Sequence, residues 1–435
     1  MSIVNNSAPG FSSYHSPIRE KQQIEVPKKL LGPQAEKEWT VLYYMDGNND
    51  LEPYIVQQMR DLEKVGSGKN VNIVAQLSRA PQKVVHKGSR ERTKIDGDWV
   101  GSRRYYVTKA PEGARKVHSP VIGMDVDPPN HGAAQSMSDF LKWGMQKFPA
   151  KHYMVVVSDH GKGFVGTGFD LLHKDHLTLP ELKDAMASAQ AETGKKPDII
   201  MFDACEMASL EVAYQLKDQA KTLVASEEVI GADGLPHIPF LKNLARHPQG
   251  GGKVHAAKMI EFSQRDEVQR KEDERVDVAL QLSAIDLTKM DALGAATTKL
   301  TAALEKSTMD SAELKEIVGA TKHFCENSRV TPDSHYRDLG HFCNLLLENE
   351  STDAKVKKAA TQVLASIDSA VLAHHTEGEG MEDTTGMSVY MPKSPMPERF
   401  NRHRSWGKFD DSYHEIDFDK ATGWSSWIDK KFAKA

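Results

Sequence analysis

The chain of 435 residues has few cysteines: only Cys205, Cys325 and Cys343 occur. Three thiols so far apart are too few for a disulfide framework or a cysteine-rich zinc site, and this scarcity is typical of proteins from a reducing compartment. Residues 1–23 also lack the apolar stretch that follows a basic start in secretory signals. The sequence therefore favours the cytoplasm as the default location and leaves secretion open.

The chain also lacks long apolar runs and a strong excess of one charge. It contains no run of about 18 apolar residues that could span a bilayer, and its mean hydropathy is -0.52. The 56 Lys and Arg residues are mixed with 61 Asp and Glu residues, which gives a formal net charge of -5. The basic stripe of a nucleic-acid-binding protein is therefore missing. We expect neither a membrane nor a nucleic acid as a partner, and we expect a monomer.

The distribution of apolar residues divides the chain into three parts. Residues 1–38 are polar and rich in Ser, Pro, Lys and Glu, which predicts a flexible leader. Over 39–240, short apolar runs alternate with helical patterns, and this alternation predicts an α/β domain whose mainly parallel sheet carries helices on both faces. Residues 241–435 are mainly helical in pattern, and we expect them to form a C-terminal subdomain packed on that domain.

Short apolar runs mark the expected strands. They cover 40–46, 70–78, 152–158, 198–203 and 221–227 in the α/β part, with two more at 278–286 and 386–392. Helical periodicity between them predicts helices over 133–148, 179–192 and 208–217. The runs at 152–158 and 198–203 are almost continuously apolar, which is typical of parallel strands buried on both faces.

A histidine and a cysteine follow these two buried runs. His160 comes two residues after the first run and Cys205 two residues after the second. Functional groups gather at the carboxyl ends of parallel strands, and a thiolate that attacks a peptide carbonyl needs an imidazole to protonate the leaving amine. Gly161 allows close approach of a substrate, and the N-terminus of the helix after Cys205 would favour the thiolate. The spacing indicates a cysteine nucleophile, with a buried structural cysteine and a loop-binding histidine as the alternatives.

Other residues of the same types are weaker candidates. Cys343 in HFCNLLLEN and Cys325 in KHFCEN both have helical patterns, so we expect them to pack in helices. His131 precedes a glycine as His160 does, but it follows DPPN and is interpreted as a helix start. Trp424 and Trp427 near the C-terminus are expected in the core.

Five blocks of the sequence resemble the clostripain family of cysteine peptidases, whose members have the caspase-like fold. The blocks are VLYYMDGNNDLE, SDHGKGFVG, MFDACEMASLEVA, ASEEVIGADGLP and LSAIDL. The resemblance implies a caspase-like three-layer sandwich and an endopeptidase that acts on peptides or proteins. It also implies a catalytic dyad of His160 and Cys205, with the main-chain N–H groups of Gly161 and Cys205 as the oxyanion hole.

Members of that family cut after Arg or Lys, so the resemblance implies a carboxylate in the S1 pocket, because a cation is best held there by a charge-assisted pair. Asp203, two residues before the cysteine, and Asp233, in Ala-Asp-Gly, match the family positions. A helix N-cap for Asp203 and a turn residue for Asp233 are the alternatives. Leu235 stands where relatives have an aromatic residue and Lys162 where they have glycine, so the shape and charge of the pocket differ here.

Relatives also mature by cutting themselves after a basic residue between the catalytic His and Cys. Lys174 in the polar segment LLHKDHL is the best match, with a solvated surface lysine as the alternative. No cofactor is required by the expected chemistry. Calcium is left open, because some members bind it and Asp46 and Asp50 could supply oxygens, although the spacing of a calcium loop is missing.

The sequence therefore predicts a cysteine endopeptidase that cleaves after Arg or Lys and processes itself between His160 and Cys205. Two alternatives remain. One is a caspase-like peptidase with a different P1 preference, which would need cations or apolar walls in its pocket. The other is a catalytically silent caspase-like module that binds a partner through its helical C-terminal half.

Overall fold

A computed structural model describes residues 27–432, apart from 31, 33, 82–95, 98, 126–128, 273–279, 326–334, 379–380, 397–399 and 402–409. The leader predicted over 1–38 therefore lies outside the described residues up to position 26. Its last part includes the short helix η1 (Lys28–Leu30), whose Leu30 is 2% exposed and belongs to the core. This end of the predicted leader is thus packed on the folded body.

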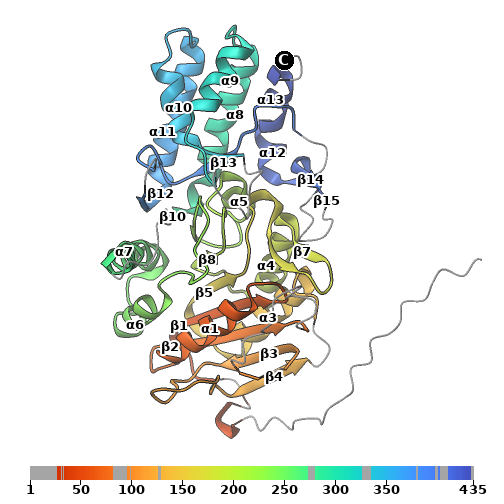
Figure 1. Cartoon of the computed structure of the whole chain (residues 1–435), viewed down its shortest axis with the longest axis vertical. Coiled ribbons are helices and arrows are strands. Elements are labelled where there is room, and N and C mark those ends of the chain that lie inside the picture. Colours follow the sequence, from red (N-terminus) through yellow and green to blue (C-terminus); the bar gives the residue numbers. More distant parts are fainter. Residues whose placement is uncertain are drawn as a thin grey trace, which may run out of the picture.

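Within the described residues, nine strands form one sheet in the order β12-β10-β9-β8-β5-β1-β2-β3-β4 (Figure 1). Its middle consists of parallel strands: β9 (Thr222–Ala225), β8 (Ile199–Asp203), β5 (Ala150–Ser158), β1 (Lys37–Gly47) and β2 (Val71–Arg79). Antiparallel strands extend both edges, namely β10 (Leu280–Asp286) with β12 (Val371–Glu377), and β3 (Gly101–Tyr106) with β4 (Val121–Asp125). The prediction of an α/β fold around a mainly parallel sheet is confirmed.

The apolar runs form the middle of the sheet because both of their faces are covered. Along β1, Leu42 and Tyr44 lie in one core while Val41 and Tyr43 lie in the other, as the two-residue period of a strand requires. Every residue of β8 is buried. A strand with two covered faces needs apolar side chains on both, which explains why its sequence shows one apolar run instead of an alternation.

Helices cover both faces of this sheet. α1 (Glu52–Glu63), α6 (His237–Arg246) and α7 (Gly251–Glu272) contribute side chains to one core, and α3 (Ala134–Lys147), α4 (Leu179–Thr193) and α5 (Leu210–Gln215) contribute to the other. The helix–sheet–helix arrangement is the three-layer sandwich that the sequence predicts. It leaves the carboxyl ends of the parallel strands at one edge, where the connecting loops meet.

The C-terminal half adds a group of helices beyond the sheet, in the upper part of Figure 1. They are α8 (Met290–Lys306), α9 (Ser311–Ala320), α10 (Leu339–Glu348), α11 (Ala354–Ala370), α12 (Asp417–Thr422) and α13 (Trp424–Phe432). Trp424 and Trp427 are fully buried in the core, as expected. Because β10 and β12 also come from this half, the sheet includes strands from both sides of residue 240.

Shorter elements connect the layers. η2 (Gly163–Val165), η3 (Leu287–Lys289) and η4 (Tyr413–Glu415) are single helical turns. Two-stranded ladders pair β6 (Thr167–Asp170) with β7 (Asp175–Leu177), β11 (Tyr336–Asp338) with β13 (Ser388–Tyr390), and β14 (Phe400–Asn401) with β15 (Asp410–Asp411). Among the helices described, none is both long and apolar enough to cross a membrane.

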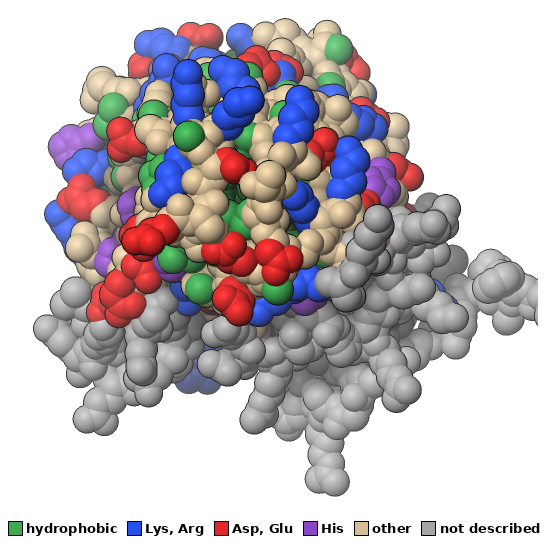
Figure 2. Space-filling view, turned by 90° about the horizontal axis from the view of Figure 1, so that it is seen from above, with side chains coloured by type: hydrophobic (Ala, Val, Ile, Leu, Met, Phe, Trp, Pro, Cys, Tyr) green, Lys and Arg blue, Asp and Glu red, His purple; other side chains and the backbone are tan. Residues whose placement is uncertain are grey.

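Figure 2 shows the surface at the end of the molecule where the C-terminal helices lie, and this surface is charged. On its described part, Lys and Arg side chains lie beside Asp and Glu side chains, and hydrophobic side chains show only in small areas between them. The large hydrophobic residues that are exposed in the described chain, Tyr54, Val100 and Val254, all lie in the first 254 residues. The described part of this face therefore shows no broad apolar patch.

A buried ion pair anchors the start of α1, the helix that borders the candidate site. Arg79 Nε, at the end of β2, donates a hydrogen bond to Glu52 Oε1 at 2.6 Å, and both side chains are fully buried. We expect Glu52→Gln to lower the free energy of unfolding by about 3–5 kcal/mol, because the guanidinium loses its buried counter-charge. Chemical denaturation of the variant beside the unchanged chain measures this loss.

The matched control breaks an ion pair on the surface. Lys430 Nζ lies 2.8 Å from Glu305 Oε1, and the lysine side chain is 60% exposed. Lys430→Gln should change the free energy of unfolding by only about 0–1 kcal/mol, because water screens this pair. Equal losses in the two variants would contradict the anchoring role of the buried pair.

Candidate active site

The ends of β5 and β8 bring the predicted histidine and cysteine segments together. These strands pair in parallel with Ser158 opposite Asp203, so the residues that follow them leave the sheet at the same edge. The two segments then touch: a Cβ placed on Gly161 would lie 2.3 Å from the Cys205 carbonyl oxygen. Only glycine fits this approach, and the structure thus places His160 and Gly161 directly beside the main chain of Cys205.

His160 is bound by a carboxylate from the loop that follows the neighbouring strand β1. It is 8% exposed, and its Nε2 lies 2.9 Å from Oδ1 of Asp50, in the loop after β1. Thr167 Oγ1 donates to the His160 carbonyl oxygen at 2.8 Å. The contact with Asp50 fixes the orientation of the imidazole ring. The sequence considered Asp50 as a helix cap or a calcium ligand, although its place in the loop beyond the end of β1, beside β5, indicates this contact.

Cys205 is buried as a neutral thiol in this uncut chain. The residue is 9% exposed, and burial raises the pKa of its thiol to about 12, with a hydrogen bond from the Ile230 main chain opposing this effect. The Ile230 N–H donates to Sγ at 3.4 Å. The expected help from a helix N-terminus is wrong, because α5 begins only at Leu210 and is capped by Ser209. The thiol therefore carries its proton at neutral pH.

Asp203, the predicted S1 carboxylate, lies in a cluster of hydrogen-bond donors. Its Oδ2 accepts from His237 Nε2 at 2.7 Å and from Gln58 Nε2 at 2.5 Å. Its Oδ1 accepts from the Leu235 N–H at 3.2 Å. The alternative role as a helix N-cap is wrong, since Ser209 caps the next helix. Sequence reasoning missed His237 and Gln58, which come from different helices.

The loop that carries Asp233 passes beside Asp203. Asp233 is exposed in a turn closed by a hydrogen bond of 2.8 Å from the Gly234 N–H to the Gly231 carbonyl oxygen. Gly234 has a φ of +71°, and a Cβ there would lie 2.7 Å from Asp203 Oδ2. Leu235 is 5% exposed. The loop thus covers one side of the Asp203 carboxylate, and Asp233 lies at its solvent side.

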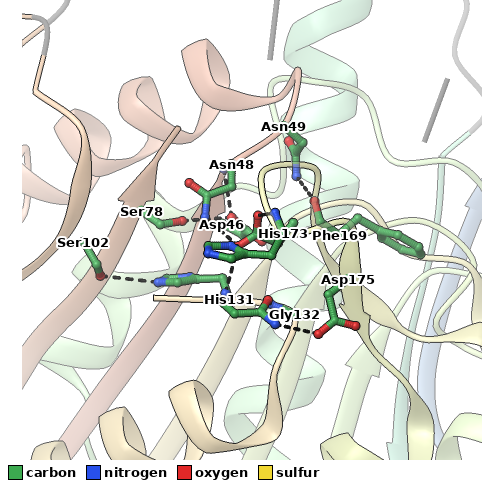
Figure 3. A network of polar contacts seen from close by, with 12 residues as sticks. Asp46, Asn48, Asn49, Ser78, Ser102, His131, Gly132, Phe169, His173 and Asp175 are labelled. Atoms are coloured by element: carbon green, nitrogen blue, oxygen red, sulfur yellow. Dashed lines mark hydrogen bonds and ion pairs between the residues drawn. The ribbon is translucent and has the colours of Figure 1, made fainter. Parts of the chain in front are cut away.

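Lys174 lies in the turn between β6 and β7, and a buried polar network holds this hairpin (Figure 3). Lys174 is exposed and has a φ of +57°. Within the network, Asp170 Oδ2 accepts from the His131 N–H at 2.9 Å and from Asn48 Nδ2 at 2.8 Å, and lies 2.8 Å from His173 Nδ1. The hairpin is therefore fixed at its base while its tip faces solvent.

His131 belongs to this network. The helix predicted to start there, α3, begins at Ala134, and His131 lies in the turn before it. Its ring stacks on Tyr44 with centroids 4.7 Å apart. Burial lowers the pKa of His131 to about 4, so this histidine is neutral at physiological pH and has a structural position away from Cys205.

The two acidic residues considered for calcium have separate partners. Asp46 is 1% exposed and its Oδ1 accepts hydrogen bonds from Ser78 Oγ and the Asn48 N–H, both at 2.8 Å. Asp50 contacts His160 instead. Burial raises the pKa of Asp46 to about 8, with the charge of Asp170 adding to the effect. Among the described residues, no group of three or more His, Cys, Asp or Glu could hold a metal, and calcium dependence stays a prediction.

The other two cysteines lie in different surroundings. Cys343 is fully buried in α10, as expected, and burial raises its pKa. The helix expected around Cys325 is wrong: the residue has a φ of +60° outside any helix, and its N–H donates to Glu228 Oε2 at 3.0 Å. All three cysteines are free thiols, and of these Cys205 is the one beside a histidine segment at the strand ends.

Solved structures share the arrangement of this chain. A secreted C11 cysteine protease from Bacteroides thetaiotaomicron, in complex with an irreversible peptide inhibitor, superimposes with a TM-score of 0.60 at 19% identity, covering 89% of this chain and 99% of that one. An inactive zymogen C11 protease from Parabacteroides distasonis gives a TM-score of 0.60 at 16% identity over 90% of this chain and 99% of the other. At these identities the likeness establishes the caspase-like fold.

Sequence comparison extends the match from fold to family. The chain is 25% identical to clostripain from Hathewaya histolytica over 271 residues, which make up 56% of this chain and 48% of that protein. It therefore spans about half the length of that relative. The sequence profile of the clostripain family, C11, matches residues 43–430, which is most of the chain. This protein belongs to the clostripain family of cysteine peptidases.

Proposed function

We propose that this protein is a cysteine endopeptidase that hydrolyses peptide bonds after basic residues, with Cys205 as nucleophile and His160 as acid and base. The observation that carries the proposal is the contact between the His160–Gly161 segment and the main chain of Cys205 at the ends of adjacent parallel strands. Membership of a peptidase family supports it. Peptides or proteins are the substrates.

The side chains have distinct roles in this reaction. His160 takes the thiol proton, and its contact with Asp50 orients the imidazole ring. The sulfur of Cys205 then attacks the carbonyl carbon, and the oxyanion that forms is stabilised by main-chain N–H groups, for which Gly161 and Cys205 are the candidates. His160 returns the proton to the leaving amine, and water hydrolyses the thioester with His160 acting as base.

The acidic residues beside this centre support a basic P1 residue. Asp203 lies two residues before the nucleophile and is 8% exposed, so its charge is little screened by water. Asp233 is carried on the loop that covers Asp203 and adds a second negative charge at its solvent side. Together these carboxylates would attract a Lys or Arg side chain to the pocket next to Cys205.

Activation by a cut after Lys174 is part of the proposal. The exposed turn makes the bond accessible, and burial, which raises the pKa of the Cys205 thiol, supports an inactive uncut form. A cut in the β6–β7 turn would release the tip of a hairpin that starts seven residues after His160. The solved C11 protease from Parabacteroides distasonis is described as an inactive zymogen, which supports an inactive uncut form here.

The expected cytoplasmic location is not supported by the comparisons. The solved C11 protease from Bacteroides thetaiotaomicron is described as secreted. Three free thiols are compatible with either location, because they form no disulfide in the structure. We therefore propose secretion as the location to test first.

Turnover and chain integrity test the proposed reaction together. The purified chain should cleave fluorogenic peptides with Lys or Arg at P1, and its intact mass should show a cut after Lys174. Cys205→Ala should lose both properties, because the bond-forming atom is removed. Lys174→Gln should stay uncut at that bond while keeping its fold, as judged by thermal unfolding.

Failure to cleave peptides with Lys or Arg at P1 would favour one of the two alternative functions. A single uncut chain that cleaves no basic peptide, with or without calcium, would contradict the proposal and favour the catalytically silent module. Cleavage of peptides with acidic or small P1 residues, but not of Lys or Arg peptides, would favour a caspase-like peptidase of another specificity.

A second prediction concerns the contact between the two strand ends. Gly161→Ala places a Cβ 2.3 Å from the Cys205 carbonyl oxygen, so one segment must move. We expect kcat/KM for a basic peptide to fall by about 100-fold, the cost of a misplacement near 1 Å. Gly68→Ala is the control, since its added Cβ would have no atom within 4 Å. Similar activity in both variants would show that the close approach is unimportant.

A further inference from the structure

The two carboxylate oxygens of Asp203 accept different numbers of hydrogen bonds. A carboxylate has about four in-plane acceptor positions, two on each oxygen. Oδ2 already receives two donors, from His237 Nε2 at 2.7 Å and from Gln58 Nε2 at 2.5 Å. Oδ1 receives one donor, the Leu235 N–H at 3.2 Å. Two nitrogens and the covering loop therefore crowd Oδ2, and Oδ1, with one donor, is the less occupied oxygen.

The directions of these hydrogen bonds follow from the charge of the carboxylate. Turning the Gln58 amide over would place its oxygen against Oδ2, so the NH2 group must face Asp203. We assign the Nε2–H of His237 to Oδ2, because a bare ring nitrogen 2.7 Å from a carboxylate oxygen would be repelled. Gln58 Nε2 lies 2.8 Å from this ring nitrogen, so both groups crowd the same side of Oδ2. The Tyr43 hydroxyl lies 3.2 Å from the other ring nitrogen. Burial, with the charge of Asp203 adding, raises the pKa of Tyr43, so the hydroxyl keeps its proton.

The cluster is buried and well packed, so these donors are not easily displaced. The side chains of His237 and Asp203 are 4% and 5% exposed, and Tyr43 is fully buried. A Cβ on Gly234 would lie 2.7 Å from Oδ2, which shows that the covering loop also approaches this oxygen. A substrate cation therefore meets a carboxylate with one oxygen already occupied.

Lysine and arginine differ in what they need from such a carboxylate. The guanidinium pairs best through two parallel N–H donors, one to each oxygen, while the ammonium is a compact charge that needs no such fork. We propose that His237 is a specificity-determining residue: by occupying Oδ2 of Asp203 it excludes the two-pronged arginine pair and makes lysine the preferred P1 residue. This inference rests on the proposed function, because it places Asp203 in the S1 pocket.

The side-chain oxygen of Gln58 is a second acceptor that would favour lysine over arginine at P1. Its Oε1 is buried and has no hydrogen-bond partner, and its amide lies on Oδ2 of Asp203. A lysine ammonium has three donors that point in different directions. It can therefore donate to Asp203 Oδ1 and to Gln58 Oε1, if the substrate enters between them, without displacing His237.

Two substitutions of His237 form a matched pair for the test. His237→Phe keeps a ring but removes the donor to Oδ2, whereas His237→Gln keeps an N–H donor. The measurement is the ratio of kcat/KM for two fluorogenic peptides that differ only in Lys or Arg at P1. For the unchanged chain we expect a ratio of about 10 in favour of Lys, the effect of one charge-assisted hydrogen bond. His237→Phe should bring the ratio to about 1 by improving the Arg peptide, and His237→Gln should keep it.

A second variant covers the case in which His237→Phe does not fold. Gln58→Met removes the other donor on Oδ2 from the partly exposed helix α1 and should also lower the Lys to Arg ratio, by about the same factor. Thermal unfolding of each variant shows whether a change in ratio accompanies a loss of structure.

Binding measurements separate this inference from the proposed reaction. Calorimetric titration of the Cys205→Ala chain with the same two peptides needs no turnover and should show tighter binding of the Lys peptide. A chain that binds or cleaves the Arg peptide as well as the Lys peptide, or a ratio that His237→Phe leaves unchanged, would overturn the role of His237. Failure to bind either peptide would also overturn it. Tighter binding of the Lys peptide without any turnover by the unchanged chain would instead contradict the proposed reaction alone.

Discussion

The parallel pairing of β5 with β8 determines where the His160 and Cys205 segments of the candidate site lie. Both strands are buried on two faces, so their registers are fixed by packing in two cores at once. The segments beyond them must then leave the sheet side by side, and the chain has room for this only because Gly161 has no side chain toward Cys205. The core thus sets the positions of His160 and Cys205 before any polar contact contributes.

Polar side chains from other elements then bind the residues that these two strands have placed. Asp50 comes from the loop after the neighbouring strand β1 and binds His160, while Gln58 and His237 come from helices on one face of the sheet and bind Asp203. Each contact assigns a proton or an orientation to a group that the sheet has already placed. Burial opposes ionisation of the Cys205 thiol at the same time, because it raises the pKa of this group.

The sequence predicted the strands that lead to the candidate site better than the side-chain contacts within it. Apolar runs and their spacing are local signals, and they identified the strands that precede His160 and Cys205. The positions of Gln58 and His237 depend on contacts across 145 and 34 residues with Asp203, for which a single sequence gives no local pattern. Cys325 was wrongly expected in a helix because its left-handed backbone, with a φ of +60°, is held by a non-local hydrogen bond to Glu228. The helix after Cys205 starts later than its pattern suggested, since Ser209 is the residue that caps it.

The central claim is that the strand ends make Cys205, and neither of the other two thiols, the nucleophile for substrates with a basic P1 residue. The most direct test is to treat the protein with a peptidyl acyloxymethylketone that carries lysine at P1 and to map the adduct by mass spectrometry. The account predicts one adduct, on Cys205, which His160→Ala prevents. An adduct on Cys325 or Cys343 at the same rate, or no adduct before or after long incubation of the chain, would contradict it.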